Sequence, residues 1–230
     1  MKILVCVALT LCCFVIAPAQ ERVMEKAEFE SLVTGGYAHP SKWKGEKYRK
    51  TLITSTKVFG LLQTPDRSSK TIIEYGPGTD SRSISNSVVG DKPNHVEQTL
   101  RVGNWVYRRS GDKPWTRKEY AAPQAAERPE SPVEVIEANA EYQYLGPGLL
   151  KDKPVYIYVK TERRTTVSKS GGDTRETDSK TTYWIGADGM ILKHEYTAES
   201  RGPKFTSQTV VIMQYELDPS ISFAAPEIVP

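Results

Sequence analysis

Residues 153–217 most constrain what this chain can fold into, because they predict four consecutive antiparallel strands. The strands are expected at residues 154–168, 174–186, 190–200 and 204–217, which are rich in Thr, Val, Ile and Tyr. Turn sequences separate them: Gly171-Gly172, Asp188-Gly189 and Arg201-Gly202-Pro203. This part of the chain therefore predicts a meander of hairpins.

The last of these strands alternates in polarity, as a strand with one buried face does. Its first face carries Phe205, Ser207, Thr209, Val211, Met213, Tyr215 and Leu217, and its second carries Lys204, Thr206, Gln208, Val210, Ile212, Gln214 and Glu216. An antiparallel sheet with one apolar face needs a cover for that face. We expect the cover to be other parts of the chain, a ligand, or both.

The N-terminus predicts a signal peptide over residues 1–19. Lys2 supplies the positive charge, residues 3–15 form an apolar run, and Ala17-Pro18-Ala19 is a cleavage sequence. All three cysteines lie within this leader, so the mature chain is expected to hold no disulfide and no thiolate zinc site. We expect residues 20–230 to form a single domain that is periplasmic or secreted, with an uncleaved N-terminal anchor as the alternative.

The remaining segments predict a mainly β chain with a few helices. An apolar stripe predicts a helix at residues 21–33, ended by Gly35-Gly36, and residues 133–140 predict a short second helix. Further strands are expected at residues 47–58, 69–75, 81–89, 97–102, 105–109, 115–118 and 142–145.

The turn sequences also predict strand registers. A two-residue Gly171-Gly172 turn sets Thr165 opposite Asp178 and Arg163 opposite Lys180, and it brings Val159 near Trp184. The outer half of that hairpin, residues 160–180, is almost devoid of large apolar side chains, so we expect it to project into water as a charged, twisted and mobile ribbon. A two-residue Asp188-Gly189 turn pairs Ile185 with Leu192, Tyr183 with His194, and Thr181 with Tyr196.

The chemistry of the chain favours binding over catalysis. The histidines His39, His95 and His194 lie in three separate segments without metal-binding spacing, so neither a metal nor another cofactor is expected. No nucleophile and base can be paired, which makes a hydrolase the least favoured reading. The formal net charge of +3 comes from interspersed charges, and nucleic acid is not expected as a partner.

Four segments resemble the LolA/LolB-like superfamily of bacterial lipoprotein carriers. Residues 97–119 are similar to its Tyr- and Trp-bearing hairpin, residues 182–200 to its Trp/Ile–turn–Leu-Lys hairpin, and residues 209–226 to its final strand and tail. Tyr144-Leu145-Gly146 before a turn and a Tyr-rich strand also fits. Arg49 is the candidate counterpart of the functional arginine on an early strand of the carriers, although the motif around it differs.

The resemblance implies an incomplete antiparallel β-barrel, or half-barrel, with a helical lid over a hydrophobic cavity. The lid would be the N-terminal helix and residues 121–140. The expected partner is a lipid or acylated ligand, with peripheral or transient membrane contact. The expected ligand-binding face comprises Val155, Ile157, Val159, Tyr183, Ile185, Leu192, Tyr196, Val211, Met213 and Tyr215.

A second function is predicted if the apolar face is simply a filled core. The protein would then be an envelope interaction or stress-sensor module that contacts a protein partner through the charged ribbon at residues 160–180. The two readings differ in whether the apolar face leaves room for a ligand.

Overall fold

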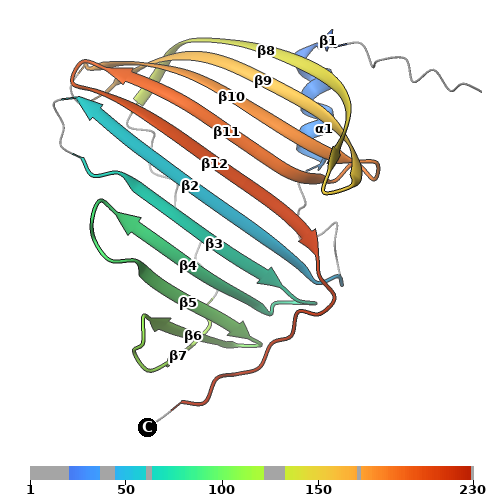
Figure 1. Ribbon diagram of the computed structural model, residues 1–230, viewed down its shortest axis with the longest axis vertical. Coiled ribbons are helices and arrows are strands. Elements are labelled where there is room, and N and C mark those ends of the chain that lie inside the picture. The colour runs from blue at the N-terminus through green and yellow to red at the C-terminus, as the bar shows by residue number, and fades with distance from the viewer. Residues whose placement is uncertain (1–20, 37–44, 61–63, 122–132, 170–171, 229–230) are drawn as a thin grey trace, which may run out of the picture.

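The computed structural model describes residues 21–36, 45–60, 64–121, 133–169 and 172–228. Within these residues the chain forms one antiparallel sheet of twelve strands and one helix (Figure 1). In chain order the elements are β1 (Arg22–Val23), α1 (Lys26–Gly36), β2 (Tyr48–Gly60), β3 (Arg67–Tyr75), β4 (Ser81–Val89), β5 (His95–Val102), β6 (Trp105–Ser110), β7 (Thr116–Glu119), β8 (Val133–Leu150), β9 (Lys153–Ser168), β10 (Thr174–Gly186), β11 (Ile191–Gly202) and β12 (Phe205–Leu217).

The strand order across the sheet is β1-β8-β9-β10-β11-β12-β2-β3-β4-β5-β6-β7. Two runs of hairpins are joined side by side where β12 pairs with β2 over the whole of both strands. In the described residues the edge strands β1 and β7 do not pair with each other, so the sheet is open. The predicted fold class, a mainly β half-barrel, is confirmed.

The sequence predicted most strands closely. The meander of four strands is present as β9 to β12, and β4 has the predicted bounds. The link between β5 and β6 is a tight turn at Gly103, whose φ of 57° suits glycine.

The first predicted helix is present but begins later than expected, and the second predicted helix was wrong. The first helix is α1, Lys26–Gly36, and the residues before it form β1, which pairs with β8. Residues 133–140 are the start of β8 and pair with β9, because hydrogen bonding to a neighbouring strand outweighs a weak local helical spacing. Of the expected lid at residues 121–140, residues 122–132 lie outside the described part of the chain.

The register of the β10–β11 hairpin was largely predicted. Tyr183 pairs with His194, and Thr181 pairs with Tyr196, as expected. The prediction for Ile185 was wrong: its partner is Ile191, because a bulge follows Trp184 and shifts the pairing by one residue.

The β9–β10 register was predicted two residues out. Thr165 lies opposite Glu176 and Arg163 opposite Asp178, because the pairing ends at Val167 and Thr174 and leaves a longer turn than two residues. A shift of two residues keeps every side chain on its face.

The charged segment at residues 160–180 does not project from the sheet, which corrects the prediction. Its β9 part pairs with β8, and its β10 part pairs with β11 from Glu176 onwards, so both flanks are covered by strands. Its charges are paired with each other and with β11: Arg163 lies 3.4 Å from Glu176, and Arg201 lies 2.7 Å from Asp178. Because these groups are exposed, each pair stabilises the fold by only about 0–1 kcal/mol.

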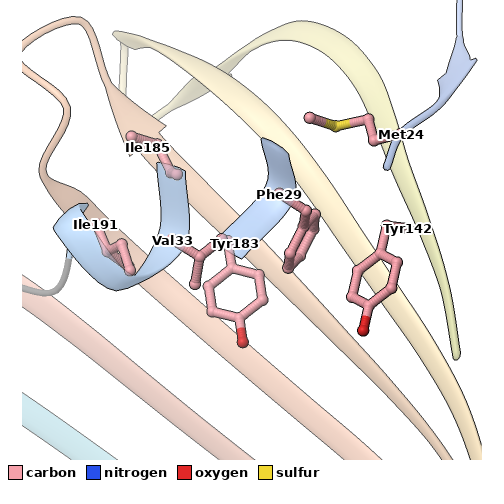
Figure 2. Packing of buried hydrophobic residues seen from close by; sticks show 7 residues of the cluster. All are labelled: Met24, Phe29, Val33, Tyr142, Tyr183, Ile185 and Ile191. Carbon is pink, nitrogen blue, oxygen red and sulfur yellow. The ribbon is translucent and has the colours of Figure 1, made fainter. Parts of the chain in front are cut away.

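The main hydrophobic core lies between α1 and the sheet (Figure 2). Phe29 of α1 is only 2% exposed, and its ring centroid lies 4.9 Å from that of Tyr142 and 5.8 Å from that of Tyr183. The buried members of this cluster are Met24, Phe29, Val33, Tyr142, Tyr183, Ile185 and Ile191. The helix therefore covers the part of the sheet formed by β8 to β11 (Figure 1).

Candidate ligand-binding face

The two faces of the sheet follow from the strand registers, because residues that lie directly opposite each other point to the same side. One row across the strands consists of Tyr158, Tyr183, His194, Met213 and Leu52. Tyr183 contacts α1, so the side that this row defines is called the helix face. Its neighbours Ile157, Trp184, Lys193, Gln214 and Thr51 define the opposite face.

Seven of the ten predicted binding residues belong to the helix face: Tyr183, Ile185, Leu192, Tyr196, Val211, Met213 and Tyr215. They fall into two buried clusters and a half-buried strip. Tyr183 and Ile185 are buried under α1. Tyr215 is buried in a second cluster with Tyr48 and Met190, against which Tyr75, Leu192 and Met213 pack.

The other three predicted residues, Val155, Ile157 and Val159, lie on the opposite face, which corrects the expectation of a single surface. Ile157 lies directly across from Trp184, and Val159 from Thr182. Val155 and Val159 are only 2% and 3% exposed. Trp184 is placed diagonally to both, within reach of a large aromatic side chain.

An apolar strip on the helix face lies beyond the helix. We define it as Leu52, Tyr196, Val211 and Met213, contributed by β2, β11 and β12. All four side chains are half-buried, whereas the residues directly under α1 are buried. Within the described residues, the helix therefore covers only part of the apolar surface on its side of the sheet.

An apolar hollow of about 380 Å³ lies where β12 meets the β8–β9 and β10–β11 turns. The apolar part of its lining comes from Leu150, Pro154, Ala187, Leu192, Tyr215 and Leu217, and Lys151, Lys153, Asp188, Gln214 and Glu216 line the rest. Leu192 and Tyr215 belong to the predicted binding set, so the hollow adjoins the second cluster. Small-molecule pockets usually have volumes of about 300–1,000 Å³. A larger hollow of about 870 Å³ crosses β8 to β12, but polar and charged residues such as Glu162, Asp178 and Lys180 line it.

Two basic groups stand on the helix face near the strip. The Lys50 ammonium group lies 5.7 Å from the centroid of the Tyr215 ring, and burial lowers the pKa of Lys50. The ring of His194 stacks on Tyr183 with centroids 5.0 Å apart. Burial and the nearby charge of Lys50 lower the pKa of His194, which favours a neutral imidazole at pH 7.

The opposite face carries a separate ion-pair network around Glu74, which is 6% exposed. Arg49 donates to the Glu74 carboxylate at 3.0 and 3.2 Å, and Arg82 Nε donates to it at 2.7 Å. Arg49 also lies 2.8 Å from Asp218, the first residue after β12. The network that includes Arg49, the candidate for the functional arginine of the carriers, thus links β2, β3 and β4 to the C-terminal segment.

Sequence reasoning missed the part of the face that β2 contributes, namely Tyr48, Lys50 and Leu52. Each alternates toward the helix face because Tyr48 pairs with Leu217, Lys50 with Tyr215 and Leu52 with Met213. Residues 47–58 did predict a strand, but no local signal showed that it lies beside the last strand of the chain.

Two other kinds of site were sought in the described residues. No group of three or more His, Cys, Asp or Glu side chains there is arranged to hold a metal ion. The described part of the chain also contains no helix long and apolar enough to cross a membrane.

Comparison with known proteins gives only distant structural similarities. No protein-family model matches the chain, and no curated protein sequence matches it. The crystal structure of LprF from Mycobacterium bovis is 10% identical with a TM-score of 0.38, and the match covers 88% of this chain and 98% of that one. A DUF1329 family protein from Desulfovibrio piger is 13% identical with a TM-score of 0.26, covering 86% and 94% of the two chains. At these TM-scores neither similarity assigns a function to this chain.

Proposed function

We propose that this protein is an exported carrier that binds a hydrophobic ligand on the helix face of its half-barrel. The ligand would be a lipid or the acyl chain of an acylated molecule, held without a covalent bond. The protein would act in the periplasm or outside the cell, in lipid or lipoprotein traffic. No catalytic step is part of this proposal.

The observation that carries the proposal is the half-buried apolar strip beside α1. Leu52, Val211 and Met213 come from two paired strands and present adjacent apolar side chains, which α1 does not bury as it buries Tyr183. The apolar hollow of about 380 Å³ extends this surface at Leu192 and Tyr215. An extended hydrocarbon chain would thus contact apolar side chains both on the strip and in part of the hollow.

The affinity expected from such a floor is moderate. Each buried methylene group contributes about 0.8 kcal/mol, so about eight of them contribute roughly 6 kcal/mol. Immobilising the ligand offsets several kcal/mol of that gain. We therefore expect a ligand that binds reversibly, as a carrier requires.

The proposal is tested with N-phenyl-1-naphthylamine, an uncharged dye that fluoresces in apolar surroundings. Wild-type protein should bind it saturably, and dodecanol should displace it. Val211→Asp should weaken dye binding at least tenfold, because it places a charge in the strip. Native mass spectrometry of protein purified from an exporting bacterial host should also reveal bound lipid.

The matched control is Val210→Asp. Val210 is the preceding residue of β12 and is also half-buried, but it points to the opposite face, where it pairs with Thr197 and Ser55. Circular dichroism would first establish that both variants fold. Equal loss of dye binding in the two variants, or no saturable binding by the wild type, would refute the proposal.

The alternative function, an interaction module acting through residues 160–180, has less support. That function required residues 160–180 to project from the sheet, with charged side chains available to a protein partner. The segment lies instead between β8 and β11, and Arg163 pairs with Glu176 within the sheet.

A further inference from the structure

Lys50 occupies an unusual position for a lysine. Its side chain leaves β2 on the helix face, directly between Tyr215 of β12 and Ile73 of β3. Along its own strand, Tyr48 is buried and Leu52 is half-buried. The ammonium group is therefore held in an aromatic and aliphatic setting instead of reaching freely into water.

No carboxylate compensates this charge within the part of the chain that the structure describes. On its own face, Lys50 lies opposite Tyr215 and Ile73, and its diagonal neighbours are Met213, Leu217, Thr71 and Tyr75. Its one described interaction is with the ring face of Tyr215. The other titratable groups around it supply no negative charge at pH 7. Burial raises the pKa of Tyr48 and Tyr75, and the imidazole of His194 is neutral or cationic.

Three other basic groups on the helix face have acidic partners, whereas Arg101 and Arg175 lie over aromatic rings. Lys160 and Arg164 both pair with Glu162, and Arg22 pairs with Glu28. Arg49, the residue before Lys50, is bound by Glu74 and Asp218 on the opposite face. A half-buried ammonium group without such a partner costs stability, which indicates that it serves a ligand.

The hollow beside Tyr215 brings this charge near the proposed ligand, and Lys151 and Lys153 line the hollow itself. Tyr215 lines the hollow, and its ring lies 5.7 Å from the Lys50 ammonium group. A chain lying in the hollow and on the strip would pass within reach of Lys50, and a charged group at its end would meet the ammonium there.

We propose that Lys50 binds the anionic head group of a single-chain amphiphile, a carboxylate or a phosphate, whose hydrocarbon chain occupies the apolar strip and the adjoining hollow. This inference rests on the proposed function, since it names the class of hydrophobic ligand. A charge-assisted hydrogen bond from a half-buried ammonium group is stronger than an exposed one, so Lys50 would select an anionic amphiphile over a neutral one.

The test compares four probes of equal chain length at pH 7: dodecanoate, dodecyl phosphate, dodecanol and dodecyltrimethylammonium. Each displaces N-phenyl-1-naphthylamine from the wild type, Lys50→Met, Lys50→Arg and Lys57→Met. The wild type should bind at least one of the two anions roughly tenfold more tightly than dodecanol. Dodecyltrimethylammonium should bind more weakly than dodecanol. The comparison of dodecanoate with dodecyl phosphate identifies which anion is preferred.

Lys50→Met should lose the preference for anions over dodecanol, and Lys50→Arg should keep the preference. Lys57 is the control, because it lies on the same strand but is exposed on the opposite face. If Lys50→Met does not fold, Lys50→Gln replaces it.

The outcomes separate the two proposals. If dodecanol binds but no anion is preferred, or if the preference survives in Lys50→Met, the role of Lys50 is refuted and the carrier proposal stands. If neither the dye nor any probe binds saturably to the wild type, the carrier proposal itself fails.

Discussion

Arg49 and Lys50 are adjacent in β2, yet their charged groups lie on opposite faces of the sheet and have different kinds of partner. The Arg49 guanidinium group is bound by the carboxylates of Glu74 and Asp218. The Lys50 ammonium group lies over the ring of Tyr215. Because adjacent strand residues alternate, one strand supplies a structural ion pair on one side and a candidate binding group on the other.

The Glu74 network predicts a strong effect of a small change. Glu74→Gln should lower the free energy of unfolding by about 2 kcal/mol, because Arg49 and Arg82 would lose the buried carboxylate between them. The arginines are 34% and 44% exposed, so water would recover part of the loss. Urea unfolding followed by circular dichroism measures the change. Glu97→Gln, at a side chain that is 65% exposed, is the control and should have almost no effect.

The contact between α1 and the sheet predicts which helix residue matters. Phe29→Ala should reduce the free energy of unfolding by about 3 kcal/mol, because it empties the space between Tyr142 and Tyr183. Leu32→Ala on the same helix is the comparison, since Leu32 is 39% exposed and should matter much less. Thermal unfolding of both variants checks this. Similar losses would show that α1 does not pack as described.

The surroundings of His194 predict a dependence of stability on pH. Its pKa is lowered in the folded protein from the ordinary value of 6.5, so below pH 6.5 the unfolded chain takes up a proton that the folded protein does not. The free energy of unfolding should therefore fall as the pH drops below about 6.5, by at most about 1.4 kcal/mol per pH unit from this group, until the folded histidine is also protonated.

His194→Phe should remove that part of the pH dependence while keeping a ring stacked on Tyr183. Urea unfolding of the wild type and the variant between pH 7.5 and pH 5 gives the difference, in which the acidic groups common to both proteins cancel. His95→Asn, at the exposed start of β5 and outside both hydrophobic clusters, is the comparison variant. Parallel curves for the wild type and His194→Phe would contradict the assignment.

The turn between β8 and β9 predicts a stabilising double substitution. Lys151 and Asp152 have φ values of 49° and 64°, a conformation that Asn and Gly adopt more readily. Lys151→Asn with Asp152→Gly should raise the free energy of unfolding by about 1 kcal/mol, or Tm by about 2–4 °C. Lys151→Ala serves as the control, because it removes only the exposed ion pair with Glu216. A lower Tm for the double variant would show that the turn is not strained.

Local patterns predicted the strands because a strand with one buried face shows alternating polar and apolar residues in its own sequence. The alternation of residues 205–217 separates Val211, Met213 and Tyr215 from Val210 and Ile212, and the structure keeps that separation. The Asp188-Gly189 turn likewise placed Tyr183 opposite His194, because a short turn leaves few registers open.

Local patterns failed where a second element decides the outcome. Residues 133–140 have a weak helical spacing, but β9 is available as a pairing partner along their whole length, and they form a strand. The bulge after Trp184 shifted the partner of Ile185 by one residue. The sequence of the turn does not predict this bulge.

The sequence by itself determined that this chain is a mainly β protein of hairpins with one apolar side, because turn residues and a period of two are local properties. Only the tertiary structure decided what shares that side. Pairing of β12 with β2 brings Lys50 beside Tyr215 across more than 160 residues of chain, and the β9–β10 register turns Val155, Ile157 and Val159 to the opposite face. Such long-range pairings depend on the complementarity of whole strands, so no single segment encodes them.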